Sequence, residues 1–205
     1  MTPIPRRSVL AAAGAALLGR PAWAALVPTP PQTTGPFYPL EPPLDDDNDL
    51  TRVAGESASA EGEVLHVAGR VLDAGGEPLA GARVEIWQAN AHGRYIHPWD
   101  RSAAPLDPGF QGFGHALADD TGAYRFRTVR PGLYAGRTRH IHVRIEAPGR
   151  DPLVTQMYFA GEPANARDGL YARLSPEERA AVTVELAETP DEPETRTGVF
   201  DIVLN

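Results

Sequence analysis

The 205-residue chain contains no cysteine. Disulfide bonds, a structural zinc site built on thiolates and a cysteine nucleophile are therefore all excluded. No segment reaches the roughly 18 consecutive apolar residues of a membrane-spanning helix. The sequence also has no glycine-rich phosphate-binding loop and no Gly-x-Ser-x-Gly motif, so nothing in it indicates a nucleotide-dependent enzyme or a serine hydrolase.

The first 24 residues differ from the rest of the chain. Arg6 and Arg7 precede a short apolar run, and residues 22–24 (AWA) have the small-x-small form of a cleavage site. This order is typical of an export signal, and the paired arginines favour the twin-arginine route over the general secretory route. We expect cleavage near Ala24, which would leave the mature protein in the periplasm or outside the cell.

The remaining chain is acidic and begins with an irregular segment. Residues 1–24 carry three arginines and no acid, so their removal takes the net charge from −8 to −11. This charge disfavours nucleic acid or anionic lipid as a partner. Residues 25–62 are rich in proline and then in aspartate, which predicts an extended N-terminal arm. Its run Asp45–Asp49 lacks the glycine and distal glutamate of an EF-hand, so we expect a solvated loop.

Residues 63–205 have the pattern of one all-β domain. The 20 glycines and 21 prolines of the chain favour many turns over long helices. About eight short strand-like segments, separated by turn-rich loops, predict an antiparallel β-sandwich with long loops. One or two short helices are expected. The clearest covers residues 175–181, where Ser175 can cap the helix, Pro176 suits its first position and Glu178 completes a capping box.

Two of the six histidines stand one residue apart in the segment RHIHVRI, residues 139–145. Side chains alternate between the two faces of a strand, so His140 and His142 point the same way, while Ile141 and Val143 point into the core. Two imidazoles with this spacing can bind one metal ion. The alternative is two polar residues on a solvated sheet face, and the spacing alone leaves both interpretations open.

Two tyrosines in turn-rich segments could complete a metal site: Tyr95 in NAHGRYIHP and Tyr134 in RPGLYAGRTRHIH. A buried phenol normally keeps its proton, but a trivalent cation makes phenolate the stable form. Two phenolates and a hydroxide would neutralise ferric iron, leaving neutral imidazoles to fill the shell. The alternative is a ferrous site with two histidines and a carboxylate, for which Glu146 is the local candidate.

Several longer stretches resemble one known family. They are VEIWQANAHGRY, PLDPGFQGFGHALADDTGAYRFRTVRPGLY, GRTRHIHVRI and TQMYFAGEP, preceded by QTTGPFYPL. They are similar to the intradiol ring-cleavage dioxygenases, above all to the protocatechuate 3,4-dioxygenase type and its secreted single-chain relatives, over about residues 32–162. The resemblance implies a β-sandwich that holds one non-haem Fe(III) and cleaves a catechol-type aromatic diol with O₂ to a cis,cis-muconate.

The resemblance also implies roles for individual residues. The implied iron ligands are Tyr95, Tyr134, His140 and His142. Tyr134 would in addition take a proton from the diol, and Arg137, from a loop curled over the iron, would stabilise negative charge on the ring. Gln156 would line the same site, and Gly35 and Pro36 would help to wall the substrate pocket. The short link AGRTR between Tyr134 and His140 leaves the pocket roof and the choice of diol open.

Other functions compete with this one. The segment VAGRVLDAGGEPLAGARVEIW also resembles transthyretin-like sandwiches, so a binding module or a catalytically silent relative is the alternative, and a zinc hydrolase using the two histidines is a third. Members of the dioxygenase family range from monomers to large assemblies, so a homo-oligomer also stays open. We assign surface, loop or packing positions to the other candidate side chains: His66, His92, His97, His115, Trp87, Trp99, Tyr124 and Tyr158.

Overall fold

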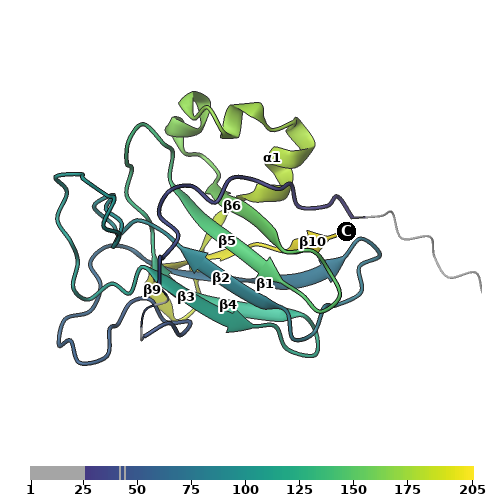
Figure 1. Ribbon diagram of the computed structural model, residues 1–205, viewed down its shortest axis with the longest axis horizontal. Coiled ribbons are helices and arrows are strands. Elements are labelled where there is room, and N and C mark those ends of the chain that lie inside the picture. Colours follow the sequence, from purple (N-terminus) through teal and green to yellow (C-terminus); the bar gives the residue numbers. More distant parts are fainter. Residues whose placement is uncertain (1–25, 42, 44) are drawn as a thin grey trace, which may run out of the picture.

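The computed structural model describes residues 26–205 except residues 42 and 44. Two stacked β-sheets form the domain, with a short helical segment beside one of them (Figure 1), which confirms the all-β sandwich. The predicted export signal, residues 1–24, lies outside the described residues, so it stays a prediction. None of the described helices is both long and apolar enough to cross a bilayer.

The first sheet has the order β10-β1-β9-β8, with β4 on the other edge of β1, and the second has the order β3-β2-β5-β6-β7. The strands are β1 (Val64–Asp73), β2 (Arg83–Trp87), β3 (Phe113–Leu117), β4 (Ala123–Val129), β5 (His140–Glu146), β6 (Leu153–Phe159), β7 (Thr183–Val184), β8 (Leu186–Thr189), β9 (Glu192–Val199) and β10 (Ile202–Leu204). The sheets are mixed rather than purely antiparallel, because β1 runs parallel to β9 and β10, and β6 runs parallel to β7. Long connections permit these parallel pairs.

The hydrophobic core lies between the sheets. In β5, Ile141, Val143 and Ile145 are buried in it, as the alternation predicted. Leu65 and Val67 of β1 meet them from the opposite sheet. The other face of β5 therefore points away from the core, and whatever covers that face decides the environment of the two histidines.

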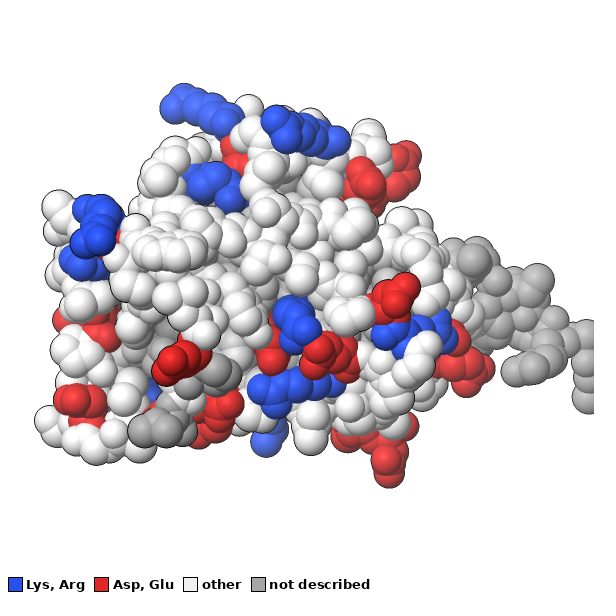
Figure 2. All heavy atoms as spheres, viewed as in Figure 1, with Lys and Arg blue, Asp and Glu red and all other residues white. Residues whose placement is uncertain are grey.

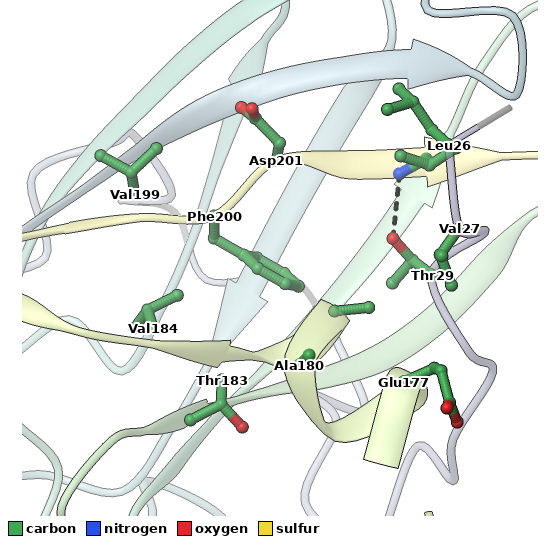
Figure 3. Close-up of a pocket in the computed structure, with 12 residues that line it drawn as sticks. Leu26, Val27, Thr29, Glu177, Ala180, Thr183, Val184, Val199, Phe200 and Asp201 are labelled. Carbon is green, nitrogen blue, oxygen red and sulfur yellow. Dashed lines mark hydrogen bonds between the residues drawn. The ribbon is translucent and has the colours of Figure 1, made fainter. Parts of the chain in front are cut away.

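The N-terminal arm lies against the domain, as Figure 1 shows for the dark purple segment. The backbone N–H of Thr29 donates to Val203 O at 3.0 Å, and that of Gln32 donates to Val154 O at 2.8 Å. The Thr29 side chain accepts from Val203 N at 2.9 Å, and here the arm forms one wall of a groove whose other wall includes Ala180 (Figure 3). None of the predicted site residues lines this groove.

The helical segment follows β6 and consists of two 3₁₀ turns, η1 (Pro163–Arg167) and η2 (Tyr171–Arg173), and the helix α1 (Pro176–Val182). The predicted capping box is confirmed: Ser175 Oγ accepts from Glu178 N, and the Glu178 carboxylate accepts from Ser175 N at 2.7 Å.

Basic and acidic side chains are interspersed over the face of the molecule shown in Figure 2.

Candidate metal centre

The pairing of β5 with β2 and β6 determines which residues lie beside the two histidines. His142 pairs with Trp87 of β2 on one side and with Gln156 of β6 on the other. The Trp87 and His142 rings stack with centroids 4.8 Å apart and an interplanar angle of 9°. His140 and His142 expose only 2% and 1% of their surface. The solvated-face interpretation of the pair is therefore wrong, because Trp87 and the arm cover this face of β5.

Burial also sets the protonation of the two imidazoles. His140 Nδ1 lies 2.7 Å from Thr138 O, and because a carbonyl only accepts, Nδ1 carries the proton and Nε2 has a free lone pair. Burial, reinforced by the nearby Arg137 charge, lowers the pKa of His140 to about 4. Burial and the neighbouring His140 hold the pKa of His142 well below its usual range. Both rings are neutral near pH 7, which is the form that binds metals.

Two tyrosines from two different loops lie against this face of β5. Tyr95 lies between β2 and β3, Tyr134 lies between β4 and β5, and their ring centroids are 5.1 Å apart. The Tyr134 hydroxyl lies 3.4 Å from His140 Nε2, and the Tyr95 ring lies 6.4 Å from that of His142. The four predicted ligand side chains therefore lie together, on one face of the sheet.

Both phenols are buried enough to hold their protons in the absence of a cation. Burial, with a further contribution from Tyr134, raises the pKa of Tyr95 well above its ordinary value. Burial also raises the pKa of Tyr134, although the Arg137 guanidinium acts in the opposite direction. The Tyr95 hydroxyl is fully buried and has no hydrogen-bond partner within the described part of the chain. A buried hydroxyl without a hydrogen-bond partner is energetically costly. The Tyr95 oxygen is therefore suited to a ligand that comes from outside the protein.

Two glycines bring the tyrosine loops into contact. A Cβ on Gly93 would lie 2.0 Å from Leu133 O, and a Cβ on Gly132 would lie 2.2 Å from Gly93 N. Both backbone N–H groups donate to Asn90 O, at 3.0 and 2.8 Å. Only residues without a side chain permit this approach. We did not predict this role from the sequence, although a glycine stands two residues before each tyrosine.

Arg137 lies in the loop before β5, at the end of a tight turn. Its backbone N–H donates to Tyr134 O at 2.8 Å, and the turn residues Ala135 and Gly136 have φ of 44° and 73°. The guanidinium donates from Nη2 to Gln156 Oε1 and from Nε to Asp168 Oδ2, each at 2.7 Å. The structure thus brings Arg137 and Gln156 together. We did not predict Asp168 from the sequence.

The N-terminal arm covers part of the site and contacts His142, Tyr95 and Gln156. Gly35 has a φ of 69°, and a Cβ there would lie 3.2 Å from His142 Cε1. Pro36 connects it to Phe37, whose ring lies 4.6 Å from that of Tyr95. The amide of Gln156 donates to Thr33 O at 3.1 Å and ties the arm to β6. We did not predict Phe37 from the sequence either.

Some of the remaining candidates lie beside the site and others lie away from it. His97, expected as an ordinary loop residue, is buried, with its ring 5.6 Å from that of Phe37. Trp99 is exposed. Tyr124 is buried in the core between the sheets, and the Tyr158 hydroxyl donates to Gln32 Oε1 at 2.7 Å. The other three histidines lie near acidic side chains at or close to the surface: His66 with Glu192, His92 with Glu61 and His115 with Asp46.

In the described part of the chain, carboxylates do not join the two histidines in a metal-binding group. Among residues 26–205 as described, no group of three or more histidine, aspartate or glutamate side chains could hold a metal ion. Glu146, the carboxylate considered for a ferrous site, pairs with Arg144 instead. The side-chain oxygen within hydrogen-bond distance of His140 Nε2 is the phenol of Tyr134, at 3.4 Å.

Comparison with known proteins finds dioxygenases that are similar over most of the chain. A family model described as Dioxygenase matches residues 33–205. The protocatechuate 3,4-dioxygenase beta chain of Burkholderia cepacia is 40% identical over 178 residues, covering 82% of this chain and 76% of that protein. The catechol 1,2-dioxygenase of a Pseudomonas species is 32% identical over 70% of this chain, which spans only 51% of that protein's length.

A solved structure extends the likeness to the fold. The dioxygenase domain of a dioxygenase–carbohydrate-binding fusion from Streptomyces sp. SirexAA-E has a TM-score of 0.68 and 36% identity, covering 87% of this chain and 99% of that domain. The matched stretches include the His-x-His strand, both tyrosine loops and Arg137. On the combined likeness in sequence and fold, this chain belongs to the intradiol ring-cleavage dioxygenase family.

Proposed function

We propose that this protein is a non-haem Fe(III)-dependent intradiol dioxygenase. It would cleave a catechol-type aromatic diol with O₂, between the two hydroxyl-bearing carbons, to a cis,cis-muconate. The observation that carries the proposal is the meeting of Tyr95, Tyr134, His140 and His142 on one buried face of β5. The activities named for the relatives, on protocatechuate and catechol, support the substrate class.

The four side chains fit a trivalent metal ion, and we assign them as its ligands. The two imidazoles are neutral, and the Tyr95 hydroxyl lacks any protein partner within the described residues. When bound, Fe(III) supplies Lewis acidity, which favours the deprotonated forms of the phenols and of the diol. Two phenolates also offset most of the charge of the ion, so the centre can be buried. A zinc hydrolase would have little use for two phenols.

The protein's own residues then handle protons and charge. Tyr134, whose hydroxyl lies 3.4 Å from His140 Nε2, would in its phenolate form accept a proton from the diol as the diol binds. The Arg137 guanidinium lies close enough to the Tyr134 hydroxyl to oppose the rise in its pKa, and it supplies positive charge for the ring as negative charge develops there. Gln156 accepts from Arg137 and holds it on the β6 side.

The substrate would enter beside the tight turn at residues 134–137. A pocket opens there, lined by side chains that include Leu133, Tyr134, Arg137, Glu162 and Arg167. A Cβ on Gly136 would meet no atom within 4 Å, so the space beside this turn is open. On the other side, Phe37 and the arm pack against Tyr95 and exclude water from the rings. The open side leaves room for substituted diols.

The test combines colour with product analysis. Iron-loaded protein should absorb in the visible range through tyrosinate–Fe(III) charge transfer, consume O₂ with a panel of catechols and give muconates by mass. Tyr134→Phe should change the band and slow turnover. Tyr124→Phe is the matched control, because the Tyr124 hydroxyl donates to Phe200 O at 2.6 Å in the core. A colourless iron-loaded protein, or a semialdehyde product from cleavage outside the diol, would contradict the proposal.

We further propose that the mature protein is exported. The support is the order of charged, apolar and small residues in residues 1–24. Expression of the full chain in a host with a twin-arginine system, followed by mass determination of the periplasmic product, should show loss of about 24 residues. Recovery of the uncleaved chain from the cytoplasm alone would oppose it.

A further inference from the structure

A fully buried carboxylate lies behind the Arg137 guanidinium. Asp168 stands between η1 and η2 and has no exposed surface. Its Oδ2 accepts from Arg137 Nε at 2.7 Å and from Thr138 N at 2.9 Å. Its Oδ1 accepts from the backbone N–H groups of Leu170 and Tyr171, each at 2.9 Å. Four donors therefore fix this carboxylate from two segments of the chain.

These contacts keep Asp168 charged in spite of its burial. Burial alone would raise the pKa of Asp168, but the N–H groups of Tyr171 and Thr138 and the Arg137 guanidinium outweigh it and hold the pKa below its ordinary value. A buried ion pair is weak evidence for stability, because desolvation offsets much of the attraction. Its geometry is nevertheless specific, since a guanidinium presents its donors in a rigid planar fork.

The two partners of Arg137 leave it little freedom. Asp168 holds the Nε side of the fork, while Gln156 accepts from Nη2. Gln156 is neutral, so it supplies no opposite charge to the guanidinium. Asp168 is the only carboxylate that the structure pairs with Arg137 among the described residues. Without it, the guanidinium loses its charged anchor and the plane of the fork is no longer fixed.

We propose that Asp168 is the positioning residue of this active site. It orients the Arg137 guanidinium toward the diol without touching substrate or metal. The inference rests on the proposed function, because it assigns Arg137 its task in ring cleavage. It also gives the helical segment a part in catalysis, since the backbone of η2 fixes the carboxylate that fixes the arginine.

The central variant is Asp168→Asn, which keeps the shape of the side chain and removes its charge. Misplacement of a reacting group by about 1 Å costs on the order of 100-fold in rate, so we expect kcat/KM to fall by roughly that factor. Iron content and the visible band should stay close to those of the wild type, because no ligand is changed. The matched control is Asp107→Asn, a buried aspartate that accepts from Glu61 N and Gly109 N and pairs with no arginine in the described residues.

A double-mutant comparison separates positioning from a structural role. In an Arg137→Ala background, adding Asp168→Asn should leave kcat/KM unchanged, because there is no guanidinium left to orient. A residue that only supports the fold would lower kcat/KM by the same factor in both backgrounds, and that result would overturn the proposal. So would an Asp168→Asn enzyme as active as Asp107→Asn. Should Asp168→Asn fail to fold, Asp168→Glu, which keeps the charge but moves it, takes its place with the same expectations.

An activity-independent measurement keeps the two proposals distinguishable. The Nε–H of Arg137, donating to a buried carboxylate, should give a slowly exchanging, shifted signal in ¹⁵N NMR spectra of the wild type loaded with diamagnetic Ga(III), because paramagnetic Fe(III) would broaden it. That signal should be lost in Asp168→Asn and kept in Asp107→Asn. A wild type that shows the signal and cleaves no catechol would refute the proposed function alone. An active wild type whose Arg137 signal is unchanged by Asp168→Asn would refute the positioning role alone.

Discussion

Replacing Gly93 with alanine should separate the two tyrosine loops. Gly93 has a φ of 83°, and its added Cβ would lie 2.0 Å from Leu133 O, whereas real Cβ contacts essentially never fall below 3.0 Å. The atom in the way belongs to the backbone, so no side-chain rotation can relieve the contact. Leu133 directly precedes Tyr134, and Gly93 precedes Tyr95 by two residues. The relief must therefore come from moving the loops that carry the two phenols.

Two contributions set the cost of Gly93→Ala to the free energy of unfolding. A non-glycine residue in the left-handed region costs about 1–2 kcal/mol, and forcing extra atoms into a packed contact costs about 1–3 kcal/mol. Together they lower the free energy of unfolding by roughly 2–5 kcal/mol, a large part of the total of about 5–15 kcal/mol for a typical domain. A shift of about 1 Å between the phenols should also weaken metal binding and turnover.

Gly149→Ala is the matched control. Gly149 has a φ of 72°, and a Cβ there would meet nothing within 4 Å, so this variant carries only the backbone term. Urea denaturation of both proteins, with iron content and the visible band measured beside it, separates the two effects. The reasoning is refuted if Gly93→Ala binds iron with an unchanged band and is no less stable than Gly149→Ala.

Three further substitutions test other contacts. Ser175→Ala removes the helix cap and should lower the free energy of unfolding by about 1 kcal/mol in urea titrations; no change would mean that the capping box is not stabilising. Ala135→Gly relieves a φ of 44° and should raise the free energy of unfolding by up to about 1 kcal/mol, because the relief of backbone strain exceeds the entropy cost of glycine. A lower melting temperature would contradict this. Gly35→Ala brings a Cβ within 3.2 Å of the His142 ring and should alter the visible band and raise KM; unchanged values for both would show that the arm does not bear on the site.

Much of the fold follows from local patterns in the sequence. The alternation in RHIHVRI predicted which residues of β5 face the core, and the SPEE segment predicted the start of α1. Both patterns are complete within a few residues. The parallel pairing of β1 with β9 joins Val64 to Thr195, and no local pattern records a contact between segments so far apart. The antiparallel sandwich expected from strand spacing was therefore right in class and incomplete in topology.

For the site, too, local motifs predicted some features and long-range packing determined the others. The four proposed ligands stand in short motifs, so the sequence alone sufficed to nominate them. Their burial could not be read from those motifs, because the cover of His142 comes from Trp87 on a neighbouring strand and from Gly35, more than a hundred residues upstream. Spacing left both a metal pair and a solvated face open, and the packing of Trp87 and of the arm decided between a buried and an exposed pair.

Asp168 shows why the rest of the site escaped prediction. It stands in the segment NARDGLY, where nothing distinguishes it from a surface aspartate in a turn. Its significance arises only when the turn between η1 and η2 folds against the loop before β5 and places the carboxylate 2.7 Å from Arg137 Nε. Groups that bind a metal need particular chemistry and therefore leave motifs. Groups that orient other side chains need only the right place, so their role becomes visible only in the folded chain.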